Sequence, residues 1–259
     1  MTLPAFPPST TKLVGTMLYL LGLSIVSAQG PEKEGPDGPT FSTTEKWDPS
    51  VLIYAGRNPK FLPATWKEEI RLAPAPTAIS ERTKQELAAL LVLQQKRTSS
   101  QEDQIRAEAE LKGFRFGPHK YSAIMNGQNF PATKRLLEAA FEDSSIAMFA
   151  LKRSNNRARP RHLEPRLKPV VPPPGHPAYP SGHATQSQLF GLLLAECDPS
   201  HQRAILADAD RIARNREIAG VHYRSDTIAG QALARKLHEL LSKNDRFAKL
   251  LEAAKAEWR

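Results

Sequence analysis

The segment containing Arg216, His222 and Asp226 carries the residue types of a nucleophile and its support. His222 and Asp226 are four residues apart, so on a helix beginning near Val221 they would share one face. A carboxylate that accepts a hydrogen bond from Nδ1–H fixes the imidazole tautomer and leaves Nε2 as a lone-pair nucleophile. Taken alone, the pair also fits an ordinary histidine–aspartate contact on a helix surface.

A second segment, Pro180-Ser181-Gly182-His183, directly precedes a helical run at 184–196. Ser181 is a favourable N-cap, and Gly182 lets the backbone approach a ligand closely. The free N–H groups of a first helical turn bind anions, so we expect His183 beside any anion held there. A single histidine near a helix start is more often structural, but this one follows an unusually proline-rich loop.

Lys152, Arg159 and Pro160 form the third segment. Seven residues is close to two helical turns, so we expect both cations on one face at a helix C-terminus, where Pro160 stops the helix. A solvated basic surface explains this pattern equally well when it is taken alone. With Arg216 added, the three segments supply three cations, helix N–H groups, two histidines and a carboxylate. Phosphoryl transfer needs this set, because it depends on charge stabilisation and positioning.

In this order the segments resemble a known signature. The pattern K-x6-RP … PSGH … R-x5-H-x3-D is similar to that shared by type 2 phosphatidic acid phosphatases, bacterial class A non-specific acid phosphatases and vanadium haloperoxidases. The resemblance covers roughly residues 70–259, and it is strongest to the class A acid phosphatases. The matching positions are Lys152, Arg159, Pro160, Pro180, Ser181, Gly182, His183, Arg216, His222 and Asp226.

The resemblance implies an all-α helical bundle of the acid phosphatase and vanadium haloperoxidase type, with an irregular N-terminal arm. It also implies an acid phosphatase that hydrolyses phosphomonoesters through a phosphohistidine: His222 attacks phosphorus, Asp226 orients it and His183 protonates the leaving group. The implied phosphate-binding residues are Lys152, Arg159, Ser181, Gly182 and Arg216. No metal or other cofactor is expected, and vanadate is expected as an inhibitor. If the chain is instead a haloperoxidase, vanadate is its cofactor and His222 its ligand.

Two positions depart from the pattern. Asn215 stands where a serine usually precedes the arginine, and we expect altered hydrogen bonds around the site with activity preserved. Ala219 stands where many class A members carry a cysteine. Because Cys197 is the single cysteine, an intrachain disulfide and a cysteine-based zinc site are excluded. The stretch 177–185 also looks like the corresponding haloperoxidase sequence, so that alternative stays open.

Apolar residues recur at helical spacing over most of the chain after residue 80, and strand signals are nearly absent. This pattern predicts an all-α bundle. Ser99 and Glu102 form a capping-box pattern, which predicts a helix that Gly113 ends. The expected helices cover about 80–96, 99–112, 133–156, 182–196, 200–218, 223–242 and 245–257, with a long loop at 160–180.

The first 76 residues differ in composition from the rest. An apolar run from Leu13 to Val26, followed by small residues up to Ala28, predicts a secretory signal peptide at 1–28. A Pro-rich arm at 29–76 then precedes the all-α phosphatase domain at 77–259. We therefore expect a periplasmic or secreted protein with no stable membrane insertion after signal cleavage. The oligomeric state is left open.

The net charge of +9 favours anionic partners. Small phosphorylated substrates fit best. The alternative of another class is a basic polyanion-binding protein, because the stretch 152–168 is rich in Lys and Arg. Aromatic residues that would stack on bases are missing there, so no nucleic-acid partner is expected. A metal site at His183, His222 and Asp226 is disfavoured by the cations expected around it.

Overall fold

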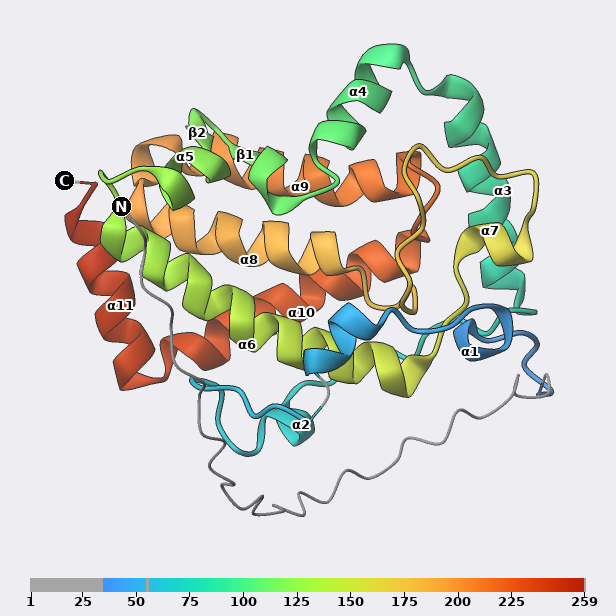
Figure 1. The fold of residues 1–259 in the computed structure, drawn as a ribbon, viewed down its shortest axis with the longest axis horizontal. Coiled ribbons are helices and arrows are strands. Elements are labelled where there is room, and N and C mark those ends of the chain that lie inside the picture. The colour runs from blue at the N-terminus through green and yellow to red at the C-terminus, as the bar shows by residue number, and fades with distance from the viewer. Residues whose placement is uncertain (1–34, 55, 259) are drawn as a thin grey trace, which may run out of the picture. The chain divides into compact units, whose positions relative to one another are not determined.

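The computed structural model describes residues 35–54 and 56–258, so the predicted signal peptide lies outside the described residues. The β-sheet of this described part is a single antiparallel pair, β1 (Arg115–Phe116) with β2 (His119–Lys120). The expected all-α bundle is therefore confirmed (Figure 1). The long helices of its central bundle are α6 (Pro131–Asn155), α8 (Gly182–Cys197), α9 (Gln202–Ile218), α10 (Arg224–Ser242) and α11 (Asp245–Ala256), and α3 (Glu81–Lys96) is a further helix as long as α8.

Within residues 35–54 and 56–258, no helix combines the length and apolar character that a membrane span requires.

Shorter elements connect and cover these helices. The shorter elements are α1 (Phe41–Thr44), η1 (Pro49–Tyr54), α2 (Trp66–Glu69), α4 (Ser99–Ala107), η2 (Leu111–Gly113), α5 (Tyr121–Asn126), α7 (Pro160–Leu163) and η3 (Pro199–His201).

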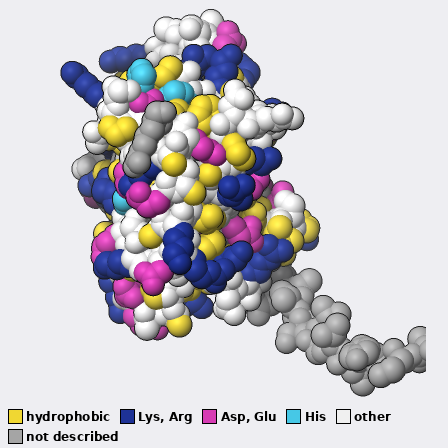
Figure 2. Space-filling view, turned by 90° about the vertical axis from the view of Figure 1, so that its left-hand side faces the viewer, with side chains coloured by type: hydrophobic (Ala, Val, Ile, Leu, Met, Phe, Trp, Pro, Cys, Tyr) yellow, Lys and Arg dark blue, Asp and Glu magenta, His cyan; other side chains and the backbone are white. Residues whose placement is uncertain are grey.

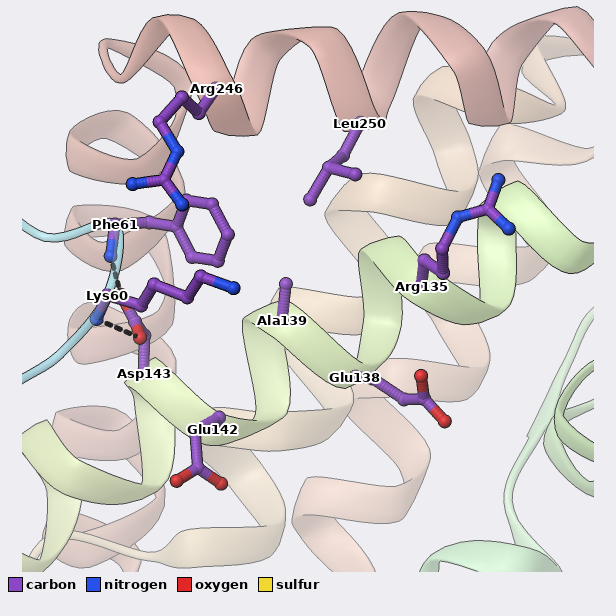
Figure 3. A pocket seen from close by; sticks show the side chains of 9 residues that line it. All are labelled: Lys60, Phe61, Arg135, Glu138, Ala139, Glu142, Asp143, Arg246 and Leu250. Atoms are coloured by element: carbon purple, nitrogen blue, oxygen red, sulfur yellow. Dashed lines mark hydrogen bonds between the residues drawn. The ribbon is translucent and has the colours of Figure 1, made fainter.

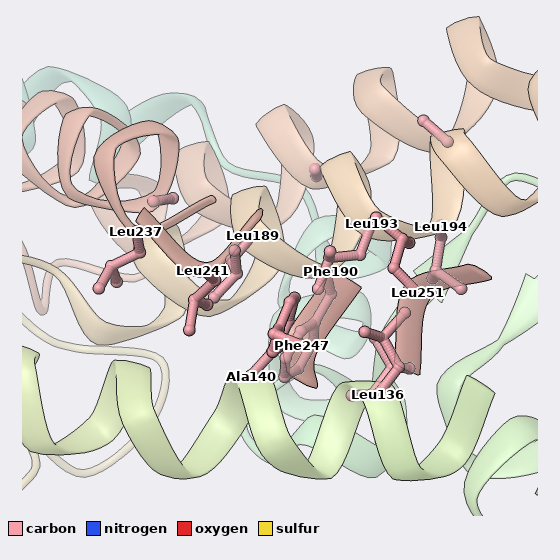
Figure 4. Close-up of a cluster of buried hydrophobic side chains, with 14 of the residues drawn as sticks. Leu136, Ala140, Leu189, Phe190, Leu193, Leu194, Leu237, Leu241, Phe247 and Leu251 are labelled. Atoms are coloured by element: carbon pink, nitrogen blue, oxygen red, sulfur yellow. The ribbon is translucent and has the colours of Figure 1, made fainter. Parts of the chain in front are cut away.

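α8 lies in the middle of the long helices and contacts α6, α9, α10 and α11 (Figure 1). Its sequence is apolar on nearly every side, as expected for a helix surrounded by others. Gly191 lets α9 come close, since a Cβ there would lie 2.9 Å from the Cβ of Ala209. Figure 4 shows Leu189, Phe190, Leu193 and Leu194 of α8 among Leu136 and Ala140 of α6, Leu237 and Leu241 of α10, and Phe247 and Leu251 of α11.

The helix expected at 99–112 is shorter than predicted. α4 ends at Ala107, and its capping box joins Thr98 to Gln101 instead of Ser99 to Glu102. The chain leaves the helix at Glu108, whose buried carboxylate accepts a hydrogen bond from Asn215 Nδ2 at 2.8 Å. This tertiary contact turns the chain toward α9 before the helix can reach Gly113.

The expectation that Lys152 and Arg159 share a helical face is wrong. α6 ends at Asn155, and Asn156 takes the left-handed conformation (φ 45°) that closes many helices. Arg159 is extended and acts as the N-cap of α7, in which Pro160 is the first residue. Pro160 therefore begins a helix here, in the position that best tolerates proline.

The described part of the predicted N-terminal arm packs against the helices. Asp143 of α6 accepts backbone hydrogen bonds from Lys60, Phe61 and Leu62 at 2.7 to 2.9 Å. Figure 3 shows two of these bonds beside a cavity of about 460 Å³ between this turn, α6 and α11. A buried carboxylate with three N–H donors is fully engaged, so it holds the turn in place.

The buried core predicts a large cost for truncating Phe190, which is fully buried and stacks on Tyr121 with ring centroids 5.4 Å apart. We expect Phe190→Ala to lower the free energy of unfolding by about 3–5 kcal/mol, as measured by urea denaturation. The matched control is Val92→Ala, because Val92 is 46% exposed. It should change stability by about 0.5 kcal/mol or less. A similar small loss for both variants would contradict the assigned core.

Candidate active site

His222 lies in the turn before α10, and this differs from the expected helical pairing. α10 begins at Arg224 with Tyr223 as its N-cap, so His222 and Asp226 do not share a helical face. They meet nonetheless: His222 Nδ1 is 3.0 Å from Asp226 Oδ2, which also accepts the Tyr223 N–H at 3.0 Å. One carboxylate in the first turn of α10 thus caps the helix and contacts the imidazole.

The neighbours of His222 determine its tautomer. Arg159 Nη1 lies 3.0 Å from His222 Nε2. Because a guanidinium only donates hydrogen bonds, Nε2 must be the accepting nitrogen, and the proton of the neutral ring is on Nδ1, facing Asp226. The lone pair is therefore on Nε2, as expected for a nucleophile, and in this structure it accepts a hydrogen bond from Arg159.

Arg159 is fully buried and is held by backbone and imidazole groups. Its Nε donates to the carbonyl of His176 and its Nη1 to that of Val221, both at 2.9 Å. Its Nη2 donates to His176 Nδ1 at 2.9 Å. His176 was missed in the sequence because an isolated histidine in a Pro-rich loop has no periodic or spacing signal. Burial lowers the pKa of Arg159 to about 10, so the side chain stays charged at neutral pH.

Arg157 is a second residue that sequence reasoning missed. Its Nη1 donates to Asp226 Oδ1 at 2.6 Å and to Ser225 Oγ at 2.7 Å. Its Nη2 lies 3.2 Å from Glu86 Oε2, and its guanidinium lies 3.8 Å from the centroid of the Tyr223 ring. The side chain thus braces Asp226 from the side opposite His222. The only signal for it was its place between two motif cations.

The Ser181-Gly182-His183 turn opens α8 as predicted. Ser181 Oγ accepts the Ala184 N–H, and the Ser181 N–H donates to the backbone carbonyl of Asp226 at 3.0 Å. This bond brings the second and third segments together. A Cβ on Gly182 would lie 2.8 Å from Met148 Sδ, so the position has little room for a side chain.

His183 is held by the segment that follows α4. Its Nε2 lies 3.1 Å from the carbonyl oxygen of Glu108 and 3.2 Å from that of Ala109. Carbonyl oxygens only accept, so Nε2 carries the proton and Nδ1 is the nitrogen left to act on a ligand.

Arg216 differs from the other buried cations in having unpaired donors within the part of the chain that the structure describes. Its side chain is buried at the end of α9, and its Nε and Nη1 have no hydrogen-bond partner among the described residues. An unpaired buried charge is costly, so such a group points to an anion that binds there. Burial lowers its pKa to about 10.

Arg216 lines a cavity of about 340 Å³ together with Gly182, His183 and His222. Its polar lining thus includes the histidines of two of the sequence segments and the Arg216 guanidinium, together with Ser50, Ser145 and Gln186, and the remaining wall is largely apolar. That wall includes Val51, Ile53 and Tyr54 of η1, Phe141, Met148 and Phe149 of α6, and Pro174 and His176 of the Pro-rich loop.

Among the described residues, Lys152 is not one of those that line this cavity. Its ammonium is buried and donates to the carbonyls of Pro177, Ala178 and Pro180 at 2.8, 3.2 and 2.6 Å. Burial, with Arg159 nearby, lowers its pKa well below the usual value. Three carbonyls use all three donors of the ammonium, so in this structure the side chain braces the loop that leads to Ser181.

Burial disfavours the charged forms of His222 and His183, two of the histidines that line the cavity. Burial lowers the pKa of His222 well below its ordinary value, and the charges of Arg159 and Lys152 lower it further. Burial also lowers the pKa of His183, and Arg216 adds to the effect. An anion in the cavity acts in the opposite direction, because it stabilises an imidazolium.

No protein-family model matches the chain. A non-specific acid phosphatase of Providencia stuartii is 35% identical over 81 residues, which are 31% of this chain and 33% of that protein. A lipid A 1-phosphatase of Rhizobium etli is 38% identical over 93 residues, which are 34% of this chain and 40% of that protein. The chain thus spans only about a third to two fifths of the length of these curated relatives.

A solved structure, the first bacterial vanadium-dependent iodoperoxidase, has the same fold. The TM-score is 0.60 at 18% identity, and the match covers 84% of this chain and 63% of that chain. The expected resemblance is therefore confirmed: in fold and in local sequence, the chain is similar to the superfamily that unites type 2 phosphatidic acid phosphatases and acid phosphatases with vanadium haloperoxidases.

Proposed function

We propose that this protein is an acid phosphatase that hydrolyses phosphomonoesters through a phosphohistidine at His222. The observation that carries the proposal is the pairing of an unpartnered buried guanidinium, Arg216, with a neutral imidazole whose lone pair is on Nε2, in one cavity. The local similarity to phosphatases supports it. We further propose a periplasmic or secreted location, which rests on the composition of residues 1–28.

The first half-reaction follows from the charges of the cavity. The non-bridging oxygens of the phosphate bind at the Arg216 guanidinium and the N–H groups at the start of α8. Arg159 then has an anionic acceptor in place of His222 Nε2, and the lone pair of His222 is released. Nε2 forms a bond to phosphorus while the bond to the ester oxygen breaks, and Asp226 stabilises the charge that develops on the ring.

His183 provides the proton for the leaving group in this mechanism. The bound phosphate raises the pKa of the nearby imidazole, so Nδ1 can hold a proton and pass it to the leaving oxygen. Neutral His183 then accepts a proton from water as the water attacks the phosphohistidine. Inorganic phosphate leaves, and His222 returns to its neutral form.

The proposed nucleophile is tested with His222→Ala. We expect turnover of p-nitrophenyl phosphate to fall on the order of 10³-fold or more, because no other imidazole takes its place. Acid-labile, alkali-stable radiolabel from a ³²P-labelled substrate should be trapped on the parent protein and absent from the variant. The matched control is His238→Ala, since His238 pairs with Glu196 outside the cavity. Near-normal kcat in His222→Ala would show that the nucleophile is assigned wrongly.

Arg216→Met separates stability from phosphate binding. We expect the ligand-free variant to melt at the same temperature as the parent or higher, because an uncompensated buried charge is removed. Its kcat/KM should fall by about 10²–10³-fold, and the increase in Tm caused by phosphate should be lost. The control is Arg214→Met, two residues earlier on α9, where a partly exposed guanidinium pairs with the buried carboxylate of Glu217. Unchanged phosphate stabilisation in Arg216→Met would contradict the proposed anion site.

The pH dependence follows from the direction of the pKa shifts. Burial and Arg159 lower the pKa of His222, so this nucleophile stays neutral well below pH 6.5 and the acid limb of kcat/KM is displaced to low pH. The loss of the His183 proton in the complex makes kcat fall as pH rises. We therefore expect maximal activity on the acid side of neutrality, measured from pH 4 to 9. An alkaline optimum would contradict these roles.

A further inference from the structure

A second group of chemically competent side chains lies at the opposite end of α8 from Gly182. His119 Nε2 and His201 Nδ1 are each 2.7 Å from the same oxygen, Asp198 Oδ2. The three atoms all lie within 4.8 Å of one another. Fifteen residues of helix separate His183 from Asp198, which is about 22 Å along the axis, so this group is separate from the cavity.

The three residues come from different elements. His119 is in β2, Asp198 follows the last residue of α8, and His201 ends η3. Figure 1 shows β2, α5 and the C-terminus at the same end of the long helices. The face shown in Figure 2 is this end of the molecule, and histidine side chains gather near its upper edge, beside acidic and basic ones.

The surroundings of this group hold its ligand atoms in place. His119 packs edge-on against Trp258, with ring centroids 4.6 Å apart, and its side chain is 20% exposed. Asp198 is 11% exposed, and its second oxygen, Oδ1, accepts from Ser200 Oγ. Although burial opposes the shift, hydrogen bonds from Ser200, His119 and His201 lower the pKa of Asp198 to about 2.

Two imidazoles and one carboxylate oxygen form a ligand set typical of divalent zinc and similar first-row cations. Tetrahedral ligands at zinc distances lie roughly 3.3 Å apart, so each 2.7 Å contact opens by about half an ångström. As the cation binds, it replaces the proton that each imidazole nitrogen directs at Asp198, and that proton moves to the other ring nitrogen or to water. His201 is 50% exposed, so water can supply the fourth ligand. The His238–Glu196 pair has the same His–carboxylate contact at 2.7 Å, but among the described residues no third ligand joins it to form such a group.

We propose that His119, Asp198 and His201 form a structural binding site for one divalent transition-metal cation such as Zn²⁺. The cation would tie β2 to the corner between α8 and α9. The segment that leads into β2 begins at Glu108 and Ala109, whose carbonyl oxygens hydrogen-bond with His183. The site therefore anchors the far end of the segment that supports a residue of the cavity, and it takes no part in phosphoryl transfer.

The test uses Co²⁺ as a spectroscopic probe on the chain purified without a polyhistidine tag and stripped of metal. We expect one Co²⁺ per chain, with visible ligand-field absorption of a four-coordinate N/O site. At a free Co²⁺ concentration about a hundred times the dissociation constant, the Tm should rise on the order of 5 °C. The rate of p-nitrophenyl phosphate hydrolysis at 25 °C should not depend on Co²⁺. The absence of stoichiometric binding would overturn the proposal.

The variants His119→Gln and His201→Gln should each lose the absorption and the Tm shift. His238→Gln is the matched control and should keep both. Far-UV circular dichroism and the Tm of the metal-free proteins establish that each variant is folded. If His119→Gln folds and still binds one Co²⁺ with the same spectrum, the cation binds elsewhere and the proposal is wrong. Equal loss in His238→Gln would overturn it as well.

Discussion

Burial of positive charge beside one cavity is the constraint on which the rest of the structure depends. Arg159 and Arg216 are buried, yet with pKa values lowered only to about 10 they keep their charge at neutral pH. Taking a cation out of water is costly unless other groups replace its hydration. The apolar packing around α8 provides the stability that this cost requires, and the elements around the cavity supply the replacement groups.

The buried cations differ in how far their hydration is replaced. Lys152 has three backbone carbonyls, and Arg157 has the carboxylates of Asp226 and Glu86. Arg159 has carbonyls and two imidazoles. Among the buried cations of the described residues, Arg216 is the one that keeps unpaired donors, and it lines the cavity. The hydrogen-bond partners of each cation thus separate those that build the site from Arg216, which is free to hold an anion. Residue type alone does not distinguish them.

Spacing in the sequence predicted which residues meet better than it predicted how they meet. His222 and Asp226 are in contact, but through a turn and a helix cap, because the carboxylate also accepts the N–H of Tyr223, the N-cap of α10. The order and approximate bounds of the long helices were predictable, since each carries a strong apolar pattern. The early end of α4 was not, because its cause is a contact of Glu108 with α9 more than a hundred residues later.

The residues missed in the sequence lack a local signal. Arg157 is one of many cations in a basic stretch, and His176 is an isolated histidine between prolines. They become part of the site only when the chain folds and brings Arg157 to Asp226 and His176 to Arg159. The same packing changes the interpretation of the basic stretch at 152–168. Lys152, Arg157 and Arg159 are buried within it, so they are not available to a polyanion at the surface.

The hydrogen bond from Arg159 to His222 Nε2 has a consequence for chemical selectivity. This bond occupies the imidazole lone pair, so under the mechanism proposed above His222 would be a poor nucleophile toward an uncharged electrophile. An anionic substrate would give Arg159 a better acceptor and so expose the nitrogen. The proposed mechanism therefore implies that the protein would discriminate by charge before any bond is formed.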